Sequence, residues 1–116
     1  MKRLWHATLS SIAGLAFAAR HEVPFRQELC VLALAIPCSF VIGTDFSSRA
    51  ILIASILLVM LTEVLNTAFE VLSDHVTPER SPAIKAVKDL GSAAVMIAIA
   101  IAGLLWLAAA VQWLGR

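Results

Sequence analysis

Three polar side chains lie in and just beyond an apolar run, and their spacing makes them candidates for chemistry. Glu63, Asn66 and Glu70 follow the almost wholly aliphatic stretch 51–61. Spacings of three, four and seven residues place all three on one face of a helix. An acid at the centre of a membrane span costs roughly 2.5–3.5 kcal/mol on insertion scales. Two carboxylates on this stripe therefore indicate a functional site, in preference to a polar seam that only joins helices.

A third carboxylate, Glu22, precedes the first apolar segment at the depth expected for Glu70. Two carboxylates from different helices can hold a hard cation such as Mg²⁺ together with substrate phosphates. The alternative is a surface ion pair between Glu22 and Arg26, which are four residues apart. Local spacing leaves both interpretations open.

A basic and small-residue block begins the third apolar segment. In a phosphate-binding site, Lys88 would supply a point charge and Asp89 a polar or metal contact. A basic end that anchors the helix at the membrane surface is the alternative. Gly91 and Ser92 are small enough to let helices approach closely. The sequence has no Gly-x-x-x-x-Gly-Lys-Ser/Thr loop, so any nucleotide site must differ from the common ones.

The elements that must position these residues follow from composition. The chain of 116 residues is 60% hydrophobic and 15% charged, which is too apolar for a soluble domain of this size. We predict an all-α integral membrane protein with a single domain, 1–116. It has an amphipathic surface helix at about 1–20, followed by transmembrane segments at about 28–46, 50–72 and 91–114. Polar residues interrupt the apolar pattern of the amino-terminal segment at about 1–20, which disfavours a signal peptide. Pro37 is expected to bend the first transmembrane span.

Positive charges predict the orientation. Lys and Arg gather before the first span and between the second and third, whereas only Arg49 and Arg116 lie on the other side. The positive-inside rule then places the N-terminus and the second loop in the cytoplasm. Glu63 would lie about 10 Å from the cytoplasmic end of its span, near the depth of a lipid hydroxyl. The formal net charge of +1 gives no support for a nucleic-acid partner, and we expect none.

The order and spacing of these motifs resemble the prokaryotic diacylglycerol kinase family over nearly the whole chain. The resemblance rests on the blocks Phe25–Glu28, Glu63–Glu70 with Asp74, and Lys88–Val95. Members are small integral-membrane lipid kinases unrelated to soluble kinases. The resemblance implies a homotrimer with composite sites between subunits in the inner membrane. It also implies transfer of the γ-phosphate of ATP to the primary hydroxyl of a membrane lipid.

The resemblance also implies residue roles. Glu63 resembles the catalytic base, and Glu22 and Glu70 resemble the Mg²⁺ ligands, which would also contact ATP. The other ATP contacts implied are Arg3, Ser10, Glu79, Arg80, Lys88 and Asp89. The lipid contacts implied are Arg3, Glu63, Asn66, Ser92 and Trp106. At Ser10 the chain departs from the family, because some members have an aromatic residue there.

Two segments give opposite indications about the lipid. Residues 77–82 resemble the loop of undecaprenol kinases in the same family, whereas residues 91–95 look like the diacylglycerol branch. We expect diacylglycerol to be phosphorylated to phosphatidic acid, with an undecaprenol kinase as the alternative. From the residues alone, a non-enzymatic membrane subunit and a small cation-coupled transporter are further alternatives. A transporter should have deep acids in more than one span, and here only the second span has them.

Overall fold

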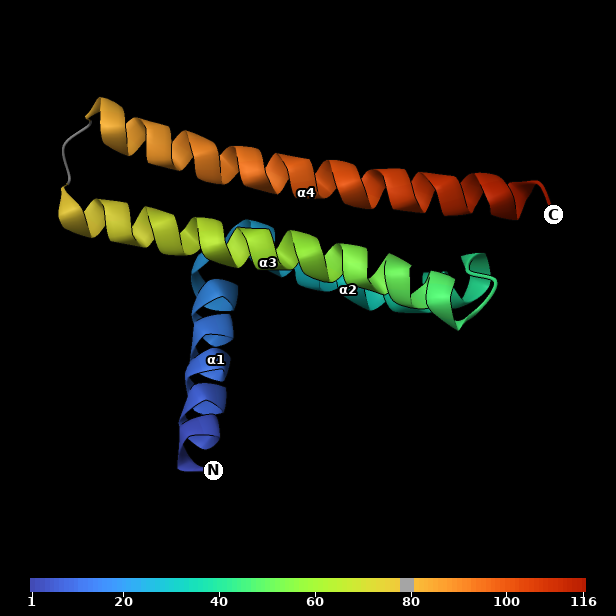
Figure 1. The fold of residues 1–116 in the computed structure, drawn as a ribbon, viewed down its shortest axis with the longest axis horizontal. Helices are drawn as coiled ribbons and strands as arrows, with labels where there is room; N and C mark the ends of the chain where they lie inside the picture. Colours follow the sequence, from blue (N-terminus) through green and yellow to red (C-terminus); the bar gives the residue numbers. More distant parts are fainter. Residues whose placement is uncertain (78–80) are drawn as a thin grey trace.

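The computed structural model describes residues 1–77 and 81–116, and this part of the chain forms four α-helices. They are α1 (Lys2–His21), α2 (Val23–Ile42), α3 (Phe46–Val76) and α4 (Pro82–Leu114). In Figure 1, α3 and α4 run side by side, α2 lies along α3, and α1 leaves the bundle crosswise. The single residue between α1 and α2 therefore turns the chain from the crosswise helix into the bundle.

Local capping fixes where the long helices begin. Asp45 accepts a hydrogen bond from the Ser48 backbone N–H at 2.8 Å, and the Ser48 hydroxyl accepts one from the Asp45 N–H at 3.1 Å. This reciprocal pair starts α3. The Ser48 bonds also hold the pKa of the Asp45 carboxyl below its usual range. At α4, the Ser81 hydroxyl accepts from the Ile84 N–H at 3.2 Å, and Pro82 occupies the first turn.

Three of the helices are long and apolar enough to cross a membrane: α2 with 20 residues, α3 with 31 and α4 with 33. An apolar bilayer core of about 30 Å needs about 20 helical residues. The predicted all-α architecture with three candidate spans is confirmed. α2 occupies Val23–Ile42, earlier than the apolar pattern at 28–46 indicated, because Pro24 suits a first turn and Asp45 already caps α3. Pro37 lies inside α2.

α3 is the central helix of the bundle, because two apolar clusters pack on different parts of it. One joins Phe25 of α2 and Ala18 of α1 to Met60 of α3. The other packs Ala98 and Ala102 of α4 on α3. Small side chains of this kind let two helices approach closely in a membrane, where tight packing replaces the hydrophobic effect as the force that joins them.

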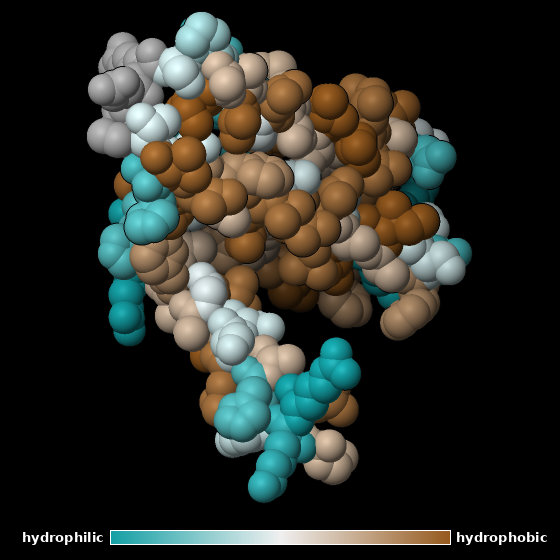
Figure 2. Space-filling model, turned by 60° about the vertical axis from the view of Figure 1, so that its left-hand side comes forward, coloured by the Kyte–Doolittle hydropathy of each residue, from teal (hydrophilic) through white to brown (hydrophobic). Residues whose placement is uncertain are grey.

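The outer surface of the bundle is apolar. Large side chains such as Leu34, Phe40 and Leu104 are exposed, and Figure 2 shows apolar residues covering most of the bundle. Hydrophilic residues gather at the free end of α1 in the same view. An exposed apolar surface of this extent marks contact with lipid or with another protein surface.

Candidate active site

Four carboxylates gather around the middle of the bundle. Glu63 on α3 is buried, with only 6% of its surface exposed. Glu22 at the junction of α1 and α2, and Glu70 further along α3, lie within electrostatic range of Glu63. Glu28 on α2 also lies within electrostatic range of Glu63. The fold thus brings acids from two helices and one junction to a single region.

Glu22 occupies an unusual place, because it is the only residue between α1 and α2. Its backbone is extended, with φ −116° and ψ 111°, and it ends one helix and begins the next. Its side chain makes no capping hydrogen bond, so the carboxylate is not used to begin α2. Phe25, one turn later and only 2% exposed, packs with Ala18 and Met60 and holds this junction against α3.

Asn66 connects Glu70 to α4. Its Nδ2 donates a hydrogen bond to Glu70 Oε1 at 3.3 Å. Its Oδ1 is buried and has no hydrogen-bond partner among the described residues. A Cβ placed on Gly91 of α4 would lie 2.2 Å from that oxygen. Glycine at this position therefore leaves the space that the Asn66 amide occupies against α4.

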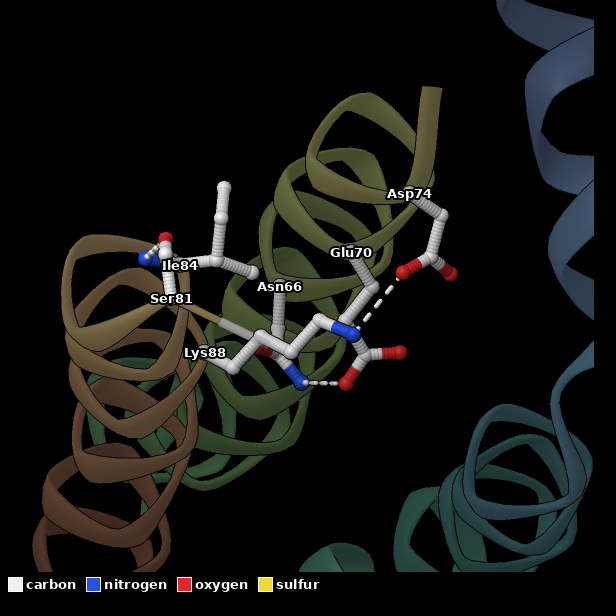
Figure 3. Close-up of polar contacts among 6 residues, drawn as sticks. All are labelled: Asn66, Glu70, Asp74, Ser81, Ile84 and Lys88. Carbon is white, nitrogen blue, oxygen red and sulfur yellow. Dashed lines mark hydrogen bonds and ion pairs between the residues drawn. The ribbon is translucent and has the colours of Figure 1, made fainter. Parts of the chain in front are cut away.

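Lys88 connects α4 to the far end of the polar stripe on α3. Its Nζ lies 2.8 Å from Asp74 Oδ1, and Figure 3 shows the side chain reaching across from α4 toward Glu70 and Asp74. Its neighbour Asp89 forms an exposed ion pair with Lys85 at 2.6 Å, within α4 itself. The two residues of the Lys88–Asp89 motif therefore have different partners, one on α3 and one on their own helix.

Trp106, Arg3 and Ser10 lie apart from the carboxylates in this chain, whereas Ser92 follows Gly91, the residue of α4 that packs against Asn66. Trp106 donates its Nε1–H to Leu52 O at 3.1 Å and to Ser55 Oγ at 3.0 Å, about 12 Å along α3 from Glu63. Ser92 is exposed on α4, and Arg3 and Ser10 are exposed on α1, whose free end points away from the bundle (Figure 1). Glu79 and Arg80 lie outside the described residues.

Two residues of the region belong to the family motifs but have no role in the site predicted from the sequence. Asp74 follows Glu70 by four residues, so the helical spacing of the stripe could have indicated it. Glu28 has no such signal, because only packing brings α2 beside Glu63. Its Oε1 is buried without a hydrogen-bond partner from the described residues. Glu28 also borders a cavity of about 530 Å³, which is otherwise lined mainly by apolar side chains of α2, α3 and α4.

Three candidate spans with a buried acid among them define the class of small integral-membrane helical proteins. Residues 9–110 match the family model described as prokaryotic diacylglycerol kinase. The chain belongs to this family of lipid kinases.

Curated relatives agree with this family. A diacylglycerol kinase of Pseudomonas aeruginosa is 39% identical over 106 residues, which cover 91% of this chain and 86% of the relative. One of Haemophilus influenzae is 37% identical over 106 residues, covering 91% and 90%. One of Escherichia coli K12 is 38% identical over 104 residues, covering 90% and 85%.

Proposed function

We propose that this protein transfers the γ-phosphate of ATP to the primary hydroxyl of diacylglycerol, producing phosphatidic acid at the cytoplasmic membrane face. The observation that carries the proposal is the buried Glu63 with Glu22 and Glu70 beside it, in a chain of a lipid kinase family. A transferred phosphoryl group needs positioning and charge neutralisation more than covalent help from the protein. In this site Glu63 can position the hydroxyl, and Glu22 and Glu70 can hold a cation that neutralises charge on the phosphates.

Glu63 acts as the general base. No described residue donates a hydrogen bond to its carboxylate, so its oxygens remain free to accept a proton from the lipid hydroxyl. The family resemblance assigns Asn66, one turn further along the same helix face, to a contact with the lipid headgroup. A hydroxyl that donates to the fixed Glu63 carboxylate is oriented toward the phosphate, and such orientation is a large part of catalysis in these reactions.

Glu22 and Glu70 suit an Mg²⁺ ion. Both are carboxylates, which Mg²⁺ prefers, and neither side chain is used up by an ion pair within the described residues. No group of three or more His, Cys, Asp and Glu in residues 1–77 and 81–116 could hold a metal by itself. Two carboxylates together with the phosphates of ATP are the usual arrangement for Mg²⁺. When bound, the ion would neutralise charge on the phosphates.

The remaining contacts are those that the family resemblance implies. Lys88 and Asp89 approach the phosphates and nucleotide, and Arg3, Ser10, Glu79 and Arg80 complete the ATP contacts. Ser92, Trp106 and Arg3 complete the lipid contacts.

Arg3, Ser10 and Trp106 lie apart from Glu63 within one chain, so the proposal includes a homotrimer with sites shared between subunits. The exposed apolar surface of the bundle supports such an assembly. The N-terminus and the loop between α3 and α4 lie in the cytoplasm, where ATP is supplied.

The substitution Glu63→Gln tests the base. Gln keeps the shape of the side chain and cannot accept the proton. Phosphoryl transfer should therefore be lost, while the assembly of the trimer and its helix content stay unchanged. Thr62→Val is the matched control, because the Thr62 hydroxyl donates only to its own helix, at Val59 O. Radiolabelled ATP and diacylglycerol in mixed micelles provide the assay. Near-normal turnover of Glu63→Gln at saturating lipid would refute the assigned role.

The lipid is tested separately. Purified protein is given diacylglycerol and undecaprenol at equal mole fraction in the same micelles. The resemblance of residues 91–95 to the diacylglycerol branch of the family supports the first lipid. A clear preference for undecaprenol would replace the substrate while leaving the kinase chemistry in place. If neither lipid is phosphorylated and no ATP is consumed, the kinase proposal is refuted and the non-enzymatic membrane subunit becomes the alternative to test.

A further inference from the structure

Arg26 could pair with Glu22 on helical spacing, but the structure gives it other partners. Its Nη1 donates to Ala19 O at 2.9 Å and to Arg20 O at 3.1 Å, both at the end of α1. No ion pair between Arg26 and Glu22 occurs within the described part of the chain. The guanidinium therefore leaves the Glu22 carboxylate free and instead joins α2 to the last turn of α1.

This contact satisfies groups that a helix end normally leaves open. The last four carbonyls of an α-helix have no partner within the helix. At α1, Ala18 O accepts the Glu22 N–H at 2.9 Å, and Arg26 supplies donors for the next two carbonyls. A cation at this end also interacts favourably with the helix dipole. Arg26 is thus a C-terminal cap delivered from the following helix.

The hydrogen bonds of Arg26 to the end of α1 also help to determine the position of Glu22. Only Glu22 separates the two helices, so any change in the angle between α1 and α2 appears directly in its backbone torsions. α1 makes few other contacts with the bundle, and these are chiefly the apolar packing of Ala18 and Ala19 in the cluster with Phe25 of α2 and Met60 of α3. The two hydrogen bonds of the Arg26 side chain are therefore a main constraint on the angle between α1 and α2.

We infer that Arg26 is a positioning residue, which holds the α1–α2 junction so that the Glu22 carboxylate faces Glu63 and Glu70. The inference rests on the proposed role of Glu22 in binding Mg²⁺ with ATP. Arg26 itself touches neither metal nor substrate in this scheme. Loss of its cap lets the junction vary, and the Glu22 carboxylate is then at the metal site for only part of the time. The apparent affinity for Mg²⁺·ATP falls by that fraction.

The variants are Arg26→Met, which keeps the stem without its donors, and Arg26→Lys, which keeps a cationic donor. Arg20→Met is the matched control, because it removes an equal charge from the same helix end without removing the cap. We expect Arg26→Met to raise the KM for Mg²⁺·ATP about tenfold, equivalent to about 1.4 kcal/mol, with a smaller change in kcat. Arg26→Lys should recover part of the loss, and Arg20→Met should leave KM unchanged.

A distance measurement separates positioning from direct contact. Nitroxide labels at Ser11→Cys on α1 and Leu72→Cys on α3, in full-length chains with Cys30 and Cys38 replaced by Ala and diluted with unlabelled protein, report the junction by pulsed electron paramagnetic resonance. Arg26→Met should broaden the distance distribution, and Arg26→Lys should narrow it again.

An unchanged KM overturns the inference, as does a raised KM with an unchanged distribution, which would mean that Arg26 contacts the ligand directly. Activity in Glu63→Gln would instead refute the proposed function, so the two failures are distinguishable.

Discussion

Gly91→Ala is expected to separate the stability of the bundle from the function of its site. An added Cβ would lie 2.2 Å from Asn66 Oδ1 and 3.2 Å from Asn66 Cγ, but 3.8 Å from Asn66 Cα. The backbones of α3 and α4 can therefore stay where they are, because only the amide group is too close. The Asn66 side chain must rotate away, and its 3.3 Å hydrogen bond to Glu70 is lost.

The stability terms of this substitution are small and of opposite sign. As an i,i+4 side-chain pair within one helix, the Asn66–Glu70 hydrogen bond contributes about 0.2–0.5 kcal/mol. Replacing Gly by Ala inside a helix returns about 0.8–1 kcal/mol. The net change in the free energy of unfolding should therefore stay within about 1 kcal/mol. Activity should fall much further, by up to about 100-fold, because displacement of a positioning group by about 1 Å has effects of that order.

The assay for Gly91→Ala is lipid phosphorylation at saturating ATP, alongside thermal unfolding in the same micelles. Gly103→Ala is the matched control, since it lies on the same helix and a Cβ there meets nothing within 4 Å. Wild-type turnover in Gly91→Ala would refute the role given to Asn66. Equal losses of activity in the two variants would show that any added methyl group on α4 is harmful, and would refute the specific contact.

Four further substitutions test other parts of the structure. Glu22→Ala and Glu70→Ala should each raise the Mg²⁺ concentration needed for half-maximal rate at fixed ATP, and an unchanged requirement in both would contradict the shared site. Trp106→Phe keeps an aromatic ring but loses the hydrogen bonds to α3, so thermal unfolding should show a loss of about 1 kcal/mol, and no loss would contradict a structural role. The lowered pKa of Asp45 means that its stabilising effect is complete above the unfolded-state value and disappears as the pH falls through the lower folded-state value. Asp45→Ala should therefore lower the unfolding temperature at neutral pH and matter little in strong acid, whereas an equal difference at both would contradict this linkage.

Much of the architecture could be predicted from the sequence because it depends on local patterns. Apolar stretches long enough to cross a bilayer indicate three spans. The positions of Glu63, Asn66 and Glu70 on one face follow from the 3.6-residue period of a helix, whatever packs against it. The family could be identified because its motifs are spaced along the chain, where they can be read directly.

Contacts between helices could not be predicted in this way. Glu22 and Arg26 have the spacing of an ion pair, yet Arg26 donates to carbonyls of α1, because the chain turns at Glu22 and brings that helix end within reach. Glu28 has no periodic relation to Glu63, and only the packing of α2 on α3 brings them together. Trp106 likewise finds its partners 51 and 54 residues away.

The sequence by itself thus determined which residues share a helix face and which helices can cross a membrane, because both follow from periodicity and apolar length. The tertiary structure alone decided which faces meet. That choice depends on the register between packed helices, which small contacts set: Gly91 against Asn66, Lys88 against Asp74, and the Arg26 cap at the end of α1.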